Sequence, residues 1–200
     1  MLSDPSKALF DACAKITAKD MDGAASIIRE RYPFIPYTNA GRNYTPYQSL
    51  QIFLQDGFLD RYSGQKLVNP AALRLLSALL PNEFPAHRNW KQSESHIAFW
   101  ELFPTIDHVI PVARGGKDHS DNWVTTSMLR NSAKSNSMLD EIGWSLHPAG
   151  QLDSWDGLTN WAIEYVDGTA DLESLTEEAS RHKTYVQKWV RASKRALAAV

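Results

Sequence analysis

Cysteine is almost absent from this sequence, which has one cysteine in 200 residues. Cys13 cannot form an internal disulfide or a cysteine-rich zinc site, so the composition favours a reducing, cytoplasmic compartment. Glycine and proline are also scarce, at ten residues each, which argues against a collagen-like or low-complexity chain. The 43% of hydrophobic residues and 22% of charged residues are typical of a globular protein with its own core.

Long apolar runs are missing as well. No segment approaches the ~20 apolar residues of a membrane span, and no basic stretch followed by an apolar run resembles a secretion signal. We therefore expect no membrane partner. The formal net charge is -2, so the strongly basic balance that marks many nucleic-acid-binding proteins is absent too. A nucleic acid would have to bind to a local basic patch.

Proline directly after a capping residue marks three expected helix starts, at Asp4-Pro5, Thr45-Pro46 and Asn69-Pro70. We expect Gly57 to end the second of these helices and Pro81 to end the third. Residues 22–31 are expected to form a further helix, and residues 58–68 a short hairpin. Residues 93–102 are ambiguous between helix and strand. The residues that recur at helical spacing in the first helix are Leu9, Cys13 and Ile16.

The second half of the chain changes pattern. β-Branched residues predict a strand over 105–110, and a polar loop over 114–121 leads to a second strand over 123–126. Ser127 is expected to cap a short helix that runs through Lys134. Residues 154–166 predict another helix, and a long helix is expected from Asp171 onward. The residues expected on its buried face include Leu172, Leu175, Val186, Trp189 and Val190.

Polar side chains with chemical potential gather between residues 107 and 134. The segment reads Asp107-His108-Val109-Ile110-Pro111, then Gly115-Gly116, then Asn122, and finally Asn131 three residues before Lys134. Order and spacing resemble the HNH endonuclease family, in the variant that has asparagine at the last motif position. The resemblance is close over 107–134 and weaker over 51–68. It implies an α+β fold, with a ββα-metal core preceded by a hairpin and extended by helices at both ends.

This resemblance also suggests how the chain is organised. Residues 1–50 would form an N-terminal helical segment, and residues 51–147 the nuclease core, with the motif at 105–135. The core would include a helical insertion over 65–104, whose role the sequence does not indicate. Helices over 148–200 would pack on this core.

The residue types in the motif suit phosphodiester hydrolysis. A water molecule must lose a proton as it attacks, and histidine is the side chain best suited to accept that proton near neutral pH. Asp107 and Asn131 offer hard oxygen ligands, which Mg²⁺ and Mn²⁺ prefer. Adjacent residues on a strand point to opposite faces, so Asp107 and His108 can share one site only where the strand end twists or bulges.

The resemblance assigns a role to each motif residue. His108 would be the general base, and Asp107 with Asn131 would hold one divalent metal ion, Mg²⁺ or Mn²⁺. Asn122 would brace the loop and keep the imidazole oriented, and Lys134 would lie near the phosphate. The products would carry a 5′-phosphate and a 3′-hydroxyl. The side chains expected to contact nucleic acid are Arg114, Lys117 and Arg130.

The chain departs from the family at the zinc-binding cysteines that many members carry. Their four positions are occupied here by Asp60, Ser63, Ser127 and Arg130. We therefore expect no structural zinc, and we predict instead that Asp60 pairs with Arg130 across that position.

These patterns favour a nuclease that cuts DNA, in restriction or phage defence, and leave RNA open as a substrate. The alternatives are an HNH-fold module that binds nucleic acid without cutting it, and a protein-interaction module. DNA affinity that falls steeply with salt would separate the last of these from the others. Whether two chains pair as a homodimer is not decided by the sequence. His119 is either a further ligand or a solvated loop residue, and the basic residues between Lys183 and Arg195 either follow a phosphate backbone or form a solvated helix face.

Overall fold

The structure, a computed structural model, describes residues 4–34, 44–168 and 177–199. The chain divides into two compact units, residues 1–41 and residues 42–200, each of which is described by itself. Helices and one small antiparallel sheet make up the described residues, which confirms the α+β class. None of the described helices combines the length and the apolarity needed to cross a lipid bilayer.

The first unit is a pair of helices, α1 (Pro5–Thr17) and α2 (Met21–Arg31), as predicted. The helices meet through small residues, since the buried positions are Ala8, Ala12 and Ala24. The larger apolar side chains that recur at helical spacing are exposed, at 48% for Leu9 and 49% for Ile16. Helical spacing therefore marked a real apolar stripe in α1, but not the stripe that contacts α2.

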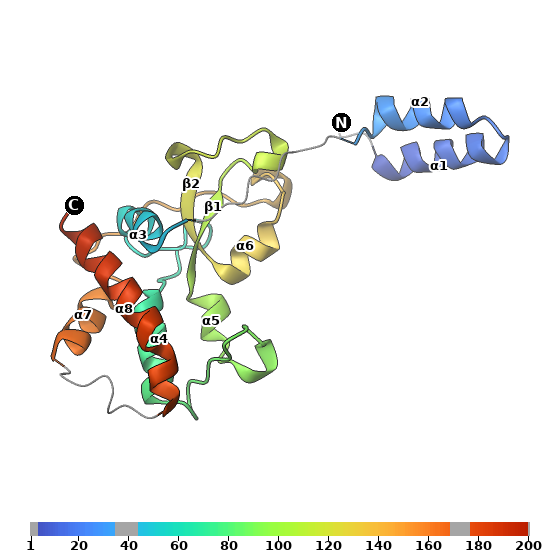
Figure 1. The fold of residues 1–200 in the computed structure, drawn as a ribbon. Helices are drawn as coiled ribbons and strands as arrows, with labels where there is room; N and C mark the ends of the chain where they lie inside the picture. Colours follow the sequence, from blue (N-terminus) through green and yellow to red (C-terminus); the bar gives the residue numbers. More distant parts are fainter. Residues whose placement is uncertain (1–3, 35–43, 169–176, 200) are drawn as a thin grey trace. The chain divides into compact units, whose positions relative to one another are not determined.

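The second unit has a helical layer made of four helices (Figure 1). Capping explains where two of them start: Thr45 and Gln48 form a capping box, and the Asn69 side chain accepts a hydrogen bond from the amide of Ala71. Val186, Trp189 and Val190 are buried in this layer, as predicted. The four helices are α3 (Pro46–Gln55), α4 (Pro70–Leu79), α7 (Thr159–Gly168) and α8 (Glu177–Leu197).

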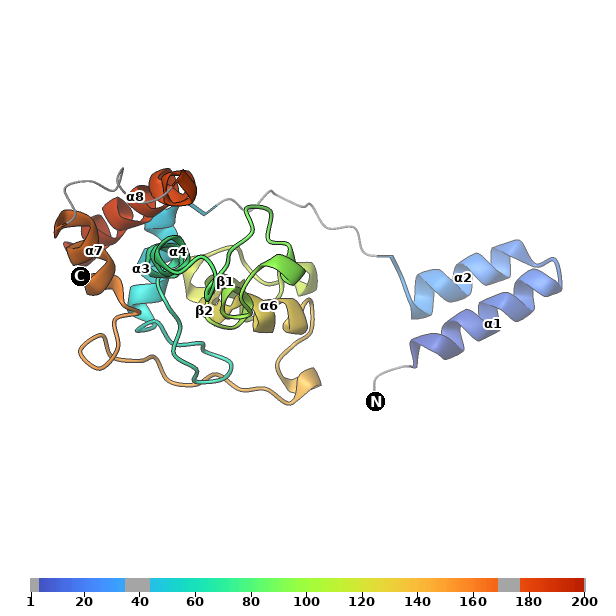
Figure 2. The same ribbon diagram turned by 90° about the horizontal axis from the view of Figure 1, so that it is seen from below.

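Beside this layer lie two strands and a helix that follow one another in the chain. Strand β1 (Pro104–His108) pairs antiparallel with β2 (Trp123–Ser127), and α6 (Met128–Lys134) follows directly, with Ser127 as its N-cap. The register is regular to its end, where His108 lies opposite Trp123. Helices α3 and α6 lie on opposite sides of the two strands in both views (Figures 1 and 2). Strand β1 therefore has no bulge at Asp107 and His108, and only the twist at its end can bring the two side chains to one site.

Three other segments differ from the sequence prediction. Residues 58–68 form turns closed by one antiparallel bridge between Leu59 and Lys66, and not a full hairpin. The ambiguous segment 93–102 contains the end of a 3₁₀ helix (Gln92–Glu94) and a short α-helix, α5 (Ala98–Glu101). The helix predicted from residue 154 starts at Thr159. The late start has a local cause, because the Asp156 side chain accepts hydrogen bonds from the amides of Leu158 and Asn160. The predicted start at Asp171, with Leu172 and Leu175, lies outside the described residues.

Gly57 follows α3 with a φ of +62°, and a Cβ added there would lie 2.4 Å from the backbone of Gly150. We expect Gly57→Ala to lower the free energy of unfolding by about 2–5 kcal/mol, from left-handed strain and overpacking together. Gly115 is the matched control, because its φ is +91° but nothing lies within 4 Å of an added Cβ. Gly115→Ala should cost only about 1–2 kcal/mol in urea denaturation. Equal losses for the two variants would contradict the contact with Gly150.

Candidate active site

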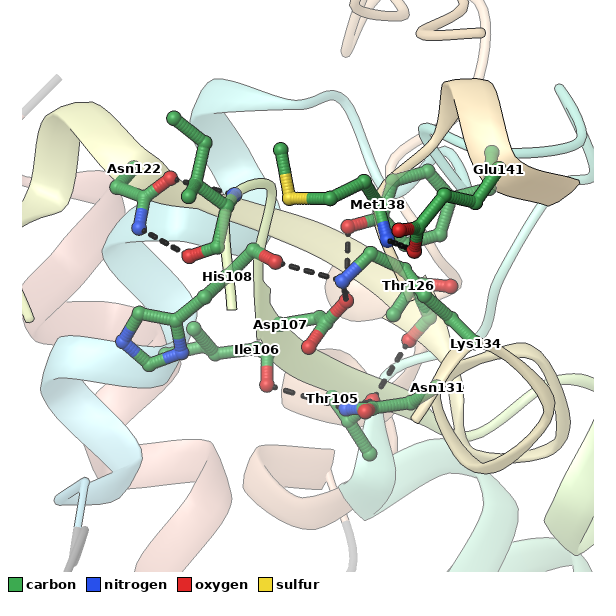
Figure 3. A network of polar contacts seen from close by, with 12 residues as sticks. Thr105, Ile106, Asp107, His108, Asn122, Thr126, Asn131, Lys134, Met138 and Glu141 are labelled. Atoms are coloured by element: carbon green, nitrogen blue, oxygen red, sulfur yellow. Dashed lines mark hydrogen bonds and ion pairs between the residues drawn. The ribbon is translucent and has the colours of Figure 1, made fainter. Parts of the chain in front are cut away.

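The Asp107 carboxylate lies at the end of β1 and is held from one side. Its Oδ2 accepts a hydrogen bond from the Tyr62 hydroxyl at 2.8 Å and lies 2.9 Å from the Lys134 Nζ. The residue as a whole is only 9% exposed. Figure 3 shows the Asp107 carboxylate directly beside the Lys134 ammonium. One oxygen is thus fixed by the protein, and Oδ1 is left without a hydrogen bond from any described residue.

Lys134, in the last turn of α6, is completely buried. Besides Asp107, its Nζ donates a hydrogen bond to the His108 carbonyl at 2.8 Å and lies 5.6 Å from the centre of the Tyr62 ring. The expected place of this ammonium near the phosphate stays a prediction, and the structure shows the ammonium buried between α6 and β1. Its contacts fix both the Asp107 carboxylate and the backbone of His108.

Tyr62 is a site residue that sequence reasoning missed. It lies in the turn segment 58–68, distant in sequence from the motif, and no local pattern distinguishes it from other tyrosines. Burial and the neighbouring Asp107 carboxylate raise the pKa of its hydroxyl. The hydroxyl therefore stays protonated and donates to Asp107 throughout the physiological range.

Asn131 extends from α6 toward the same strand. Its Nδ2 donates hydrogen bonds to the Thr105 hydroxyl at 3.0 Å and to the Ile106 carbonyl at 3.2 Å (Figure 3). These two bonds fix the orientation of the amide, because only the nitrogen can donate. Its Oδ1 accepts no hydrogen bond from the described residues and is the atom available to a ligand.

Asn122 braces the loop between the strands, as predicted. Its side chain accepts a hydrogen bond from the Ile110 amide and donates to the carbonyls of Ile110 and Lys117, each at 2.9 Å. Gly116 is required in the same loop, since a Cβ there would lie 1.9 Å from the Ile110 carbonyl oxygen. The Asn122 side chain makes no hydrogen bond to the His108 imidazole among the described residues. The polar contacts of that ring come from Asp118 and Trp123.

Two side chains hold the His108 imidazole, which is 2% exposed. Nε2 lies 2.8 Å from Oδ1 of Asp118, and the Trp123 indole nitrogen lies 3.0 Å from Nε2 and 3.1 Å from the same Oδ1. Trp123 is thus a polar partner of both His108 and Asp118. The hydrogen bond with His108, followed by those from Tyr44 and Trp123, lowers the pKa of the Asp118 carboxyl. Asp118 therefore stays ionised, and the motif gave no signal for it.

Three motif atoms have no protein partner. Among the described residues, no hydrogen bond reaches Nδ1 of His108, Oδ1 of Asp107 or Oδ1 of Asn131. Among the described residues, the only side-chain nitrogen or oxygen atoms that are both buried and without a hydrogen-bond partner are Nε and Nη1 of Arg74. The three motif atoms therefore remain in contact with solvent. They are one imidazole nitrogen and two side-chain oxygens, and the described residues hold no group of three or more His, Cys, Asp or Glu side chains that could bind a metal.

The three cationic side chains predicted to contact nucleic acid have different surroundings. Lys117 and Arg114 are exposed on the loop that carries Asp118, and the Arg114 guanidinium pairs with Glu141. Arg130, on α6, lies with its guanidinium 5.4 Å from the centre of the Trp144 ring. Lys117 and Arg114 thus lie on the loop whose Asp118 contacts His108, whereas Arg130 contacts the Trp144 ring.

The predicted pair between Asp60 and Arg130 is wrong. Asp60 is completely buried and accepts hydrogen bonds from the amides of Tyr62 and Ser127 and from the Thr126 hydroxyl, at 2.9, 2.8 and 3.2 Å. No ion pair joins it to Arg130 among the residues described. Backbone amides satisfy the carboxylate, and it links the turn that carries Tyr62 to the end of β2.

Comparison with known proteins adds no relative: no family model, no curated protein and no solved structure matches this chain. The functional argument therefore depends on the motif and on the geometry of its side chains.

Proposed function

We propose that this protein is a metal-dependent endonuclease of the HNH type that hydrolyses phosphodiester bonds of DNA and leaves 5′-phosphate and 3′-hydroxyl ends. The observation that carries the proposal is the set of three solvent-contacting atoms without a protein partner, on His108, Asp107 and Asn131. A wholly structural role for these side chains would not require all three of these atoms to face solvent. Here the atoms that hydrolysis needs are the ones left free. The resemblance extends the proposal to a role in restriction or phage defence.

Asp107 and Asn131 are the residues proposed to hold Mg²⁺ or Mn²⁺. A carboxylate oxygen and an amide oxygen are ligands that these ions accept, with water and phosphate oxygens completing the shell. The fit is supported by the way the remaining atoms are held, since Tyr62 and Lys134 fix the other oxygen of Asp107. When bound, the ion would offset the negative charge that develops on the phosphoryl group and on the leaving oxygen.

The chain's own residues supply the rest of the reaction. Nδ1 of His108 accepts the proton of the attacking water, and its ring is held from the Nε2 side. Asn122 keeps the loop in place, and the exposed cations of Lys117 and Arg114 attract the phosphate backbone beside the histidine. Lys134 contacts the Asp107 carboxylate and the His108 carbonyl and holds both in place.

Incubation of supercoiled plasmid with the purified protein tests this proposal. We expect nicking in Mg²⁺ or Mn²⁺ and none in EDTA, and a 10²- to 10⁴-fold lower rate for His108→Ala, on the order of what a general base contributes. His119→Ala is the matched control, because His119 lies in the loop 114–121 with a side chain that is 64% exposed. This variant should retain activity. A fully active His108→Ala would overturn the assignment of the base. An inactive wild type whose DNA affinity still falls steeply with salt would favour the binding module.

A further inference from the structure

We propose that Asp118 is a positioning residue that holds the His108 imidazole in the tautomer needed for catalysis. The inference depends on the proposed function, because it assigns Asp118 a part in the same hydrolysis. It concerns a loop side chain within the segment 105–135 to which the resemblance assigns no role.

The loop carries two aspartates that differ sharply in their contacts. Oδ1 of Asp118 lies 2.8 Å from Nε2 of His108 and accepts hydrogen bonds from the Trp123 indole at 3.1 Å and the Tyr44 hydroxyl at 3.2 Å. The rings of Tyr44 and Trp123 also pack edge to face, with centroids 4.9 Å apart. Asp121, by contrast, has a side chain that is 90% exposed and that lies 3.3 Å from Nδ1 of His119. Asp118 is thus held in place against the histidine, whereas Asp121 is not.

The contacts of Asp118 determine which imidazole nitrogen carries the proton. A neutral imidazole has one N–H, and a carboxylate can only accept a hydrogen bond. With Asp118 at Nε2, the N–H is placed on Nε2 and the lone pair on Nδ1. Figure 3 shows the ring with Nδ1 on the side that faces Asp107 and Nε2 on the side turned away. The nitrogen that can accept a proton is therefore the one on the side of the proposed metal ligands.

Trp123 makes this arrangement conditional on Asp118. Its indole N–H lies within hydrogen-bond distance of both Oδ1 of Asp118 and Nε2 of His108. An indole can only donate. With Asp118 present, the carboxylate takes this N–H together with the one on Nε2. Without Asp118, the indole would donate to Nε2, which would then need its lone pair, and the imidazole proton would move to Nδ1. The base would be lost although His108 itself is unchanged.

Kinetics of three variants test the inference. We expect Asp118→Ala to lower kcat about 10²-fold with little change in KM, within the range that a general base contributes. Adding Trp123→Phe to Asp118→Ala should restore part of kcat, because no donor then forces the lone pair onto Nε2. Asp121→Ala should behave as wild type. Unchanged kcat in Asp118→Ala, or a double variant no better than the single one, would overturn the role of Asp118.

Nitrogen NMR of the histidine rings separates this inference from the proposed function. We expect Nδ1 of His108 to give a pyridine-type signal in the wild type and a pyrrole-type signal in Asp118→Ala, with the resonances assigned by their loss in His108→Gln. The same spectra show whether each variant is folded. A wild type that cleaves no DNA would overturn the nuclease, and the spectra would still decide whether Asp118 sets the tautomer. An Nδ1 signal that does not change in Asp118→Ala would overturn the inference even in an active enzyme.

Discussion

Replacing Lys134 with methionine is expected to lower the free energy of unfolding by about 3–5 kcal/mol, the usual cost of leaving a buried partner charge without its counter-ion. The Lys134 side chain is 0% exposed and that of Asp107 only 12%, so solvent cannot replace the lost ammonium. The carbonyl of His108 would lose its donor as well. Urea denaturation followed by tryptophan fluorescence measures the loss.

Lys194 provides the matched control for this prediction. Its Nζ lies 2.6 Å from Asp167, but the two side chains are 45% and 54% exposed. Exposed pairs contribute about 0–1 kcal/mol, so Lys194→Met should change stability by no more than that. Adding Asp107→Asn to Lys134→Met should recover part of the stability, because no buried charge then lacks a partner. A loss below about 1 kcal/mol in Lys134→Met would contradict the buried pair.

Asp60→Ala is the second substitution with a large expected effect. We expect a loss of at least about 3 kcal/mol, since two buried amides and one hydroxyl lose an acceptor at about 1–3 kcal/mol each. Asp60→Asn keeps one acceptor oxygen and should lose less. The exposed Asp153 is the control, and Asp153→Ala should stay within about 0.5 kcal/mol of the wild type.

Hydrogen exchange locates the effect of losing Asp60. The Ser127 amide donates to Asp60, so its protection should fall more in Asp60→Ala than that of amides in α4. Unchanged stability together with unchanged protection at Ser127 would mean that the carboxylate does not hold the end of β2.

Local chemistry predicted the starts of several elements. Thr45, Asn69 and Ser127 each cap a helix as expected, because the capping bonds are made within a few residues of the cap. What the sequence did not predict depends on contacts between residues far apart in the chain. The stripe of Leu9 and Ile16 is apolar in sequence, but α1 and α2 meet through smaller side chains, a choice that helical spacing alone does not encode.

The candidate site divides in the same way. The motif placed Asp107, His108 and Asn131 within one strand, loop, strand and helix, so their proximity could be predicted from the sequence. Tyr62 could not be predicted, because a side chain 45 residues away reaches Asp107 only through the tertiary fold. Asp118 was equally hidden, since the loop is rich in acidic residues and only the contacts with His108 and Trp123 distinguish it.

The ends of the cut DNA report most directly on the proposed hydrolysis. Plasmid nicked by the protein in Mn²⁺ would be freed of protein and treated with DNA ligase, which joins a 5′-phosphate to a 3′-hydroxyl. We predict that ligase reseals the nicks without any prior treatment, and that no nicks form in EDTA. Nicks that form in EDTA, or that ligase cannot reseal until the phosphate has been moved from the 3′ to the 5′ end, would contradict a metal-dependent HNH nuclease.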